Sequence, residues 1–140
     1  MQLTRRNLAV FLGLLAPSFL LSFYGSSYWF RMVISERSFS TTHGIHWPML
    51  LSWIPSAVIF GLAGIALAMS LTTTKLVYWS LLFGGLYSIV DFAMSRHAFG
   101  ADVDFLTYFW VYGRYFVPPI ACALAACVTR SHAEHRLRNP

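Results

Sequence analysis

The chain has 140 residues, of which 57% are hydrophobic and only 11% are charged, and its formal net charge is +5. Soluble domains usually carry about 25% charged residues, so these proportions exclude an ordinary soluble domain. The positive charge does not indicate nucleic-acid binding, because the basic residues flank apolar runs, where they set the orientation of membrane segments. The composition therefore predicts an integral membrane protein.

Four apolar runs follow one another along the chain, each close to the roughly 20 residues that a helix needs to cross hydrocarbon. A lone strand in lipid would leave its backbone groups without hydrogen bonds, so each run is predicted to be a helix. The predicted spans are about residues 8–30, 49–71, 76–94 and 105–128. The fold class is therefore all-α, with one four-helix transmembrane domain over residues 1–140.

Short connections join the later spans, residues 72–75 between the second and third and residues 95–104 between the third and fourth. Consecutive helices with such short connections pack as antiparallel neighbours. The sequence thus predicts an antiparallel up-down bundle.

The distribution of Arg and Lys predicts the orientation of this bundle. The basic residues on the side of the two chain ends are Arg5, Arg6, Lys75, Arg130, Arg136 and Arg138. The other side has Arg31, Arg37 and Arg96, whose charge is offset by acidic residues in the same loops. Because the richer side is usually cytoplasmic, both termini are predicted to be cytoplasmic, in the plasma membrane of a bacterium.

Small and polar residues at helical spacing predict the packing faces, because lipid gives helices no hydrophobic reason to associate. On the second span these residues are Ala57, Gly61, Gly64 and Ala68. On the third they are Ser80, Gly84, Tyr87, Ser88, Asp91 and Ser95. The stripes predict a packed four-helix interior, with a polar pathway between the helices as the alternative.

Prolines interrupt several of the predicted helices. A proline inside a helix lacks the backbone N–H and leaves the carbonyl four residues earlier without its donor. Pro118 and Pro119 would do this to the carbonyls of Arg114 and Tyr115, so a kink is predicted in the fourth span.

Asp91 and Arg114 are the formally charged residues predicted to lie well inside the spans, where charge is expensive and often functional. Their positions on the third and fourth spans predict a pair. It is either a salt bridge that locks two helices, or a site where Asp91 exchanges protons or binds a cation while Arg114 tunes it or holds an anionic head group. Aromatic residues that would line a cavity beside the pair are Tyr87, Tyr108, Trp110, Tyr112 and Tyr115.

Residue types that bind transition metals occur in the outer loops. These candidates are His43, His46, His97, Asp102 and Asp104. Their spacing matches no closed zinc module, so metal binding is a minor alternative. No histidine falls inside a span to hold a haem, and no cofactor is expected.

The leading functional prediction is a non-enzymatic bundle that binds another membrane protein, as an accessory subunit, an assembly factor or an immunity-type inhibitor. It is based on the small-residue faces, the short loops and the lack of any catalytic motif. The alternatives are a small oligomeric transporter or channel that uses Asp91 and Arg114, and a metal-dependent lipid enzyme at the outer face. The expected partners are the lipid bilayer and a membrane protein or a second copy of the chain, without nucleic acid. The tail around His132, Glu134 and His135 is expected to anchor on anionic lipid.

Overall fold

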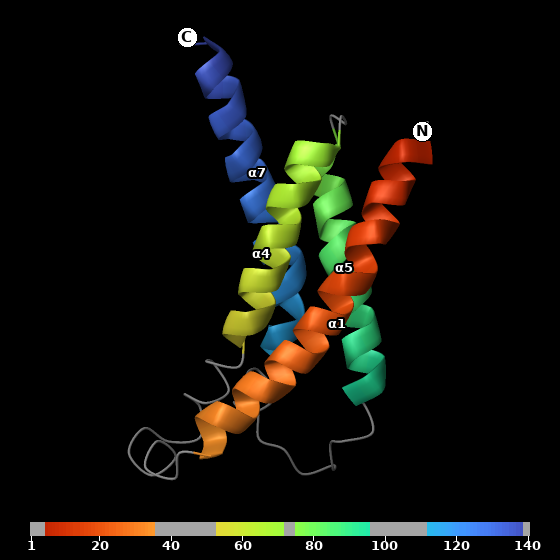
Figure 1. The fold of residues 1–140 in the computed structure, drawn as a ribbon, viewed down its shortest axis with the longest axis vertical. Coiled ribbons are helices and arrows are strands. Elements are labelled where there is room, and N and C mark those ends of the chain that lie inside the picture. The colour runs from red at the N-terminus through yellow and green to blue at the C-terminus, as the bar shows by residue number, and fades with distance from the viewer. Residues whose placement is uncertain (1–4, 36–52, 72–74, 96–111, 139–140) are drawn as a thin grey trace.

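The computed structural model of the chain describes residues 5–35, 53–71, 75–95 and 112–138. These residues are helical almost throughout, which confirms the all-α prediction for this part of the chain. The helices, drawn in Figure 1, are α1 (Arg5–Ser35), α4 (Trp53–Ser70), α5 (Leu76–Ser95), the 3-10 helix η2 (Arg114–Phe116) and α7 (Val117–Arg138). Three of them, α1, α4 and α5, are long and apolar enough to cross a membrane.

Helix α1 is longer than the predicted span of residues 8–30. It has 31 residues, which at 1.5 Å each gives a rod of about 46 Å. Since the hydrocarbon core of a bilayer is about 30 Å thick, such a helix must tilt or extend into the headgroup layers. Figure 1 shows α1 inclined to the other helices.

The fourth helical segment differs most from its prediction. The span was expected over residues 105–128, of which 105–111 lie outside the described residues. Residues 112–113 are helical, η2 follows, and α7 runs from Val117 to Arg138, ten residues beyond the expected end. Its apolar part ends at Val128 and is followed by a charged part, so α7 is not among the described helices that are apolar enough to cross a membrane.

Helix α7 packs against both α4 and α5, while α4 and α5 contact each other only sparsely. Helix α1 packs mainly against α4. The short connection between α4 and α5 therefore predicted a contact that exists but is minor. Both ends of the chain lie at the same end of the bundle (Figure 1), which we call the terminal end, and the opposite end is the distal end.

Aromatic rings fill the core near the terminal end. The rings of Phe11 and Phe83 meet edge to face at 5.2 Å between centroids, and Trp79 meets Phe11 at 5.5 Å. Phe60 and Leu67 are fully buried beside them. Edge-to-face pairs add about 0.5–1.5 kcal/mol beyond the burial of their area, so this cluster holds α1, α4 and α5 together.

Two glycines allow α7 to approach its neighbours closely. A Cβ at Gly64 would fall on the backbone of Cys122, and one at Gly84 would fall on the backbone of Pro118 and Pro119. Both glycines belong to the predicted small-residue stripes, which are confirmed at these positions. The prediction is wrong for Gly61, because a Cβ there would meet nothing within 4 Å.

Candidate functional site

The double proline of α7 determines the local structure at the distal end of the bundle. Pro119 cannot donate to the carbonyl of Tyr115, and Pro118 cannot donate to that of Arg114. The Arg114 carbonyl accepts instead from the backbone N–H of Val117, which makes the 3-10 turn η2. The Tyr115 carbonyl accepts from the hydroxyl of Ser88 on α5. Both carbonyls thus have donors, as backbone groups within a membrane require.

The Ser88 hydroxyl lies 2.5 Å from the Tyr115 carbonyl oxygen and 3.1 Å from the Gly84 carbonyl oxygen. A hydroxyl has one hydrogen, so the shorter contact across the helix interface takes the stronger share of it. Gly84 also packs directly against the backbone of the two prolines. One turn of α5 therefore positions η2 through a backbone contact at Gly84 and a hydrogen bond from Ser88.

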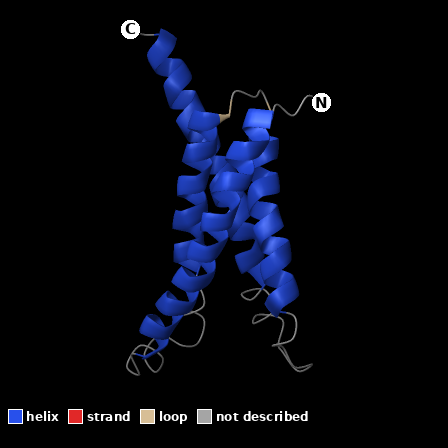
Figure 2. Cartoon of the chain, turned by 45° about the vertical axis from the view of Figure 1, so that its right-hand side comes forward, coloured by secondary structure: helices blue, strands red, loops and turns tan. Residues whose placement is uncertain are grey.

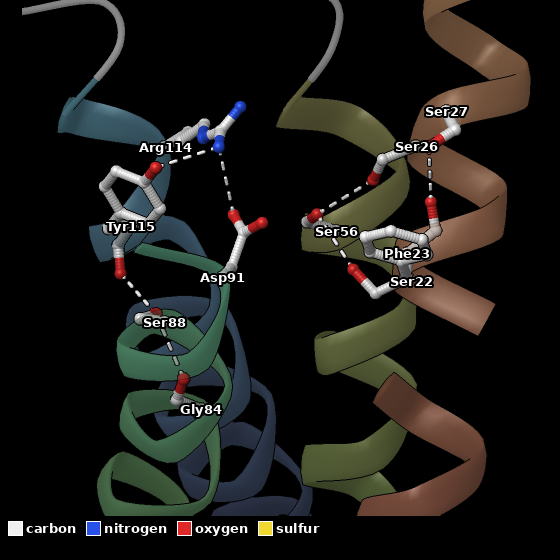
Figure 3. Close-up of polar contacts among 10 residues, drawn as sticks. All are labelled: Ser22, Phe23, Ser26, Ser27, Ser56, Gly84, Ser88, Asp91, Arg114 and Tyr115. Carbon is white, nitrogen blue, oxygen red and sulfur yellow. Dashed lines mark hydrogen bonds and ion pairs between the residues drawn. The ribbon is translucent and has the colours of Figure 1, made fainter. Parts of the chain in front are cut away.

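The ion pair predicted between Asp91 and Arg114 lies next to this contact between α5 and η2. Arg114 Nη2 is 3.4 Å from Asp91 Oδ2 and donates to the hydroxyl of Tyr115 at 2.8 Å. The guanidinium carbon lies 4.8 Å from the centroid of the Tyr115 ring, within the range of a cation–π contact. Figure 3 shows Asp91 reaching toward Arg114 from the last turns of α5.

The side chains of Asp91 and Arg114 are 18% and 35% exposed, so the pair is neither fully buried nor at the open surface. An exposed ion pair contributes about 0.2–1 kcal/mol, whereas removal of one partner from a fully buried pair costs about 3–5 kcal/mol. The contribution of the ion pair between α5 and η2 to stability is expected to lie between these limits. Its partial exposure leaves it accessible to small ions or headgroups.

Tyr87 connects this ion pair to a second polar cluster. Its side chain is 6% exposed, lies beside Ser22 and Ser56, and is within the electrostatic reach of Asp91 and Arg114. The hydroxyls of Ser22 and Ser56 are 3.1 Å apart.

Ser26 extends the second cluster, with its hydroxyl 3.2 Å from that of Ser56. Figure 3 shows the serines of α1 and α4 beside each other on one side and the ion pair on the other. We call the whole set the polar layer, and its members are Ser22, Ser26, Ser56, Tyr87, Ser88, Asp91, Arg114 and Tyr115.

The polar layer extends across the bundle rather than along its axis. It joins α1, α4, α5 and η2 near the distal end, whereas the aromatic cluster around Phe11, Phe60 and Phe83 fills the interior toward the terminal end. Outside the layer, the buried polar side chains among the described residues are those of Ser18 and Ser80.

The remaining predicted aromatic residues have mixed outcomes. Tyr112 and Tyr115 pack against the ring of Phe92, at 6.0 and 5.4 Å between centroids, and form an aromatic group beside Arg114. Tyr108 and Trp110 lie outside the described residues.

The predicted metal ligands His43, His46, His97, Asp102 and Asp104 also lie outside the part of the chain that the structure describes. Among the residues that it does describe, no group of three or more His, Cys, Asp or Glu side chains could hold a metal ion.

The serines of α1 were not singled out from the sequence. Ser18, Ser22 and Ser26 recur every four residues, a spacing that places them on one helix face. This signal was available, but serine is too common in membrane helices for the spacing alone to identify an interface.

Comparison with known proteins does not identify the chain. It matches no family model, and neither a curated protein nor a solved structure shows significant similarity to it.

Proposed function

We propose that this chain is a four-span protein of the bacterial inner membrane, with both termini in the cytoplasm, that acts by binding another membrane protein. Helices α1, α4 and α5 would supply three antiparallel spans, and the segment that ends in η2 and α7 would supply the fourth. The basic residues at the terminal end support this orientation, among them Arg5, Arg6 and Lys75, which are exposed. The role would be that of an accessory subunit, an assembly factor or an immunity-type inhibitor.

The observation that carries the proposal is the backbone of α1 at Gly13. Pro17 lies inside α1 and cannot donate to the carbonyl four residues earlier, which is that of Gly13. Gly13 is exposed, and a Cβ there would meet nothing within 4 Å. It lies eight residues beyond Arg5, or about 12 Å along the axis, within the depth of hydrocarbon. Pro17 thus removes the α-helical donor of a carbonyl on an exposed face, and in lipid such a carbonyl is stabilised by a donor from another helix.

The residues around Gly13 suit the approach of another helix. Ala9, Gly13 and Ala16 follow one another at spacings of four and three, and all are exposed. Within the bundle, the close contacts of α7 are made at glycines of the same kind, Gly64 and Gly84. A partner helix with a Ser, Thr or Asn side chain could pack on this face of α1 and donate to the Gly13 carbonyl.

The test is recovery of partners from native membranes with a tagged chain. A Gly13→Leu variant should lose most of the co-purifying protein, because the larger side chain blocks close approach without touching the core. Gly61→Leu is the matched control, since a Cβ at Gly61 also meets nothing within 4 Å but lies on α4. Isolation of wild type as a lone monomer would contradict the proposal, as would equal partner recovery by the two variants.

A second candidate is a small oligomeric transporter or channel that depends on Asp91 and Arg114. The polar layer favours it, because it places a partly exposed ion pair beside buried hydroxyls. Since this layer runs across one bundle, conduction would need further chains to complete a path. Substrate or ion uptake into proteoliposomes should then fall in Asp91→Asn, and undiminished uptake would exclude the mechanism.

A further inference from the structure

Helix α7 extends beyond the other helices at the terminal end. Its last fully buried residue is Ala126, and the twelve residues from Cys127 to Arg138 add about 18 Å of helix at 1.5 Å each. Helix α4 ends at Ser70 and α5 begins at Leu76, so neither accompanies it. Figures 1 and 2 both show the end of α7 projecting beyond the other helices. We call residues 129–138 the arm.

The arm is basic and carries its own helix-stabilising contact. Arg130, Arg136 and Arg138 outweigh the single Glu134. Arg130 Nε lies 3.5 Å from Glu134 Oε1, one turn along the helix, a contact that adds about 0.3–0.5 kcal/mol to a helix. Residues 131–135 are all exposed. Basic residues near a helix C-terminus also oppose its negative pole, which favours the helical state of the arm.

The arm lacks an apolar face. Ser131, His132, Ala133, Glu134 and His135 are all exposed, and at about 100° per residue these five positions go once around the helix axis. No large apolar side chain occurs among these five positions, unlike in amphipathic helices that lie flat with one face in the acyl region. A helix that is polar on every side fits a surrounding that is itself polar on every side.

The headgroup layer and the water next to it are such surroundings, and the arm is long enough to cross the layer. The headgroups add about 5–7 Å on each side of the hydrocarbon, and charge acts over a Debye length of about 8–10 Å. From Arg130 to Arg138 the arm rises about 12 Å, so its arginine positions lie within reach of the lipid phosphates. Exposed Arg5 and Arg6 of α1 and Lys75 are at the same end.

We propose that the arm stands in the headgroup layer of the anionic leaflet and binds anionic phospholipid headgroups through its arginines. Each arginine near an anionic surface strengthens the association about fivefold. This lipid site is independent of the α1 face that contains Gly13.

The experiment reports the surroundings of the arm in the full chain. A Cys127→Ser variant with His132→Cys carries an environment-sensitive fluorophore on the arm, while Cys122 is fully buried. The labelled protein is reconstituted in phosphatidylcholine alone or with phosphatidylglycerol. We expect phosphatidylglycerol to shift the emission to the blue and to reduce quenching by acrylamide, and we expect high salt to reverse both effects.

Charge variants separate lipid binding from other causes. Replacing Arg130, Arg136 and Arg138 by Gln should abolish the response to phosphatidylglycerol, and replacing them by Lys should keep it. The control Arg31→Gln removes one exposed charge near the other end of α1 and should change nothing. A signal that ignores phosphatidylglycerol, or one that survives the three Gln substitutions, overturns the proposal. A response in native membranes but not in phosphatidylglycerol bilayers would assign the arm to an acidic protein instead.

Discussion

At the scale of single residues, the most informative contacts are those that replace lost backbone hydrogen bonds. Pro118 and Pro119 leave two carbonyls without their α-helical donors, and η2 and Ser88 supply substitutes. Pro17 does the same to Gly13, on an exposed face of α1. Because unpaired backbone groups are costly in lipid, the first case stabilises the bundle from within. The second case is the basis of the partner contact that we propose for α1.

Removal of the Ser88 hydroxyl should destabilise the bundle. In Ser88→Ala the Tyr115 carbonyl loses its donor, at a cost of about 1–2 kcal/mol. The measurement is the free energy of unfolding in mixed micelles under SDS titration. Ser27→Ala is the control, because the Ser27 hydroxyl is exposed and bonds only to its own helix, at the Phe23 carbonyl. An equal loss of stability in both variants would show that the contact with Tyr115 contributes nothing.

The ion pair should show energetic coupling. Asp91→Asn and Arg114→Gln each remove one partner, and the double variant removes both, so it should be less destabilised than the sum of the single variants by about 0.5–2 kcal/mol. A double-mutant cycle on the same unfolding transition measures this coupling. Strict additivity would mean that the 3.4 Å contact contributes no stability.

At the scale of helices, α7 is the element on which the others depend. It contacts both α4 and α5, and its backbone reaches each of them at a glycine, Gly64 and Gly84. Close backbone approach increases van der Waals contact, which is the main source of helix association in lipid. Helix α1, by contrast, packs mainly against α4, and serines of the polar layer lie at this contact.

Two adjacent glycines of α5 should respond oppositely to alanine. Gly84→Ala places a Cβ on the backbone of the two prolines and should cost about 1–3 kcal/mol or displace α7. Gly85→Ala meets nothing within 4 Å and should be neutral or stabilise by up to about 1 kcal/mol, since alanine favours helix. Unfolding transitions of the two variants compare them directly. If Gly84→Ala were as stable as Gly85→Ala, α7 would not pack on α5 in this way.

At the scale of the whole molecule, the bundle has two unlike ends. The polar layer binds four helical segments together near the distal end, and the aromatic cluster fills the terminal end. The two cysteines report on this interior, because Cys122 is fully buried between helices and Cys127, five residues later, is exposed. Five residues at about 100° each place the two thiols on different sides of the helix.

Thiol labelling should therefore follow the integrity of the bundle. In folded protein in mild detergent, a small maleimide should modify Cys127 and spare Cys122. The Cys127→Ser variant should label only after SDS unfolds the chain, and Cys122→Ser should label at once. Rapid modification of Cys122 in the folded protein would show that α7 does not pack against its neighbours.

Hydropathy and charge along the chain were enough to define helical segments, because segment length and the need to pair backbone groups in lipid are local properties. They predicted the C-terminus of α4 and the N-terminus of α5 to within one residue, at Ser70 and Leu76. The double proline likewise indicated where the backbone of the last segment departs from a regular α-helix. The small-residue rule correctly identified Gly64 and Gly84.

Packing alone distinguishes residues that are identical in sequence terms. Gly13, Gly61, Gly64 and Gly84 all lie at helical spacing with small or polar neighbours, yet only the last two touch another helix closely. The short connection predicts α4 and α5 as close neighbours, whereas in the structure both pack mainly against α7. Lipid solvates every apolar face about equally well, so partner choice among helices depends on complementary surfaces and on the few hydrogen bonds between them. Those surfaces come from residues far apart in the chain, and only the folded bundle brings Ser22, Ser56 and Tyr87 to one place.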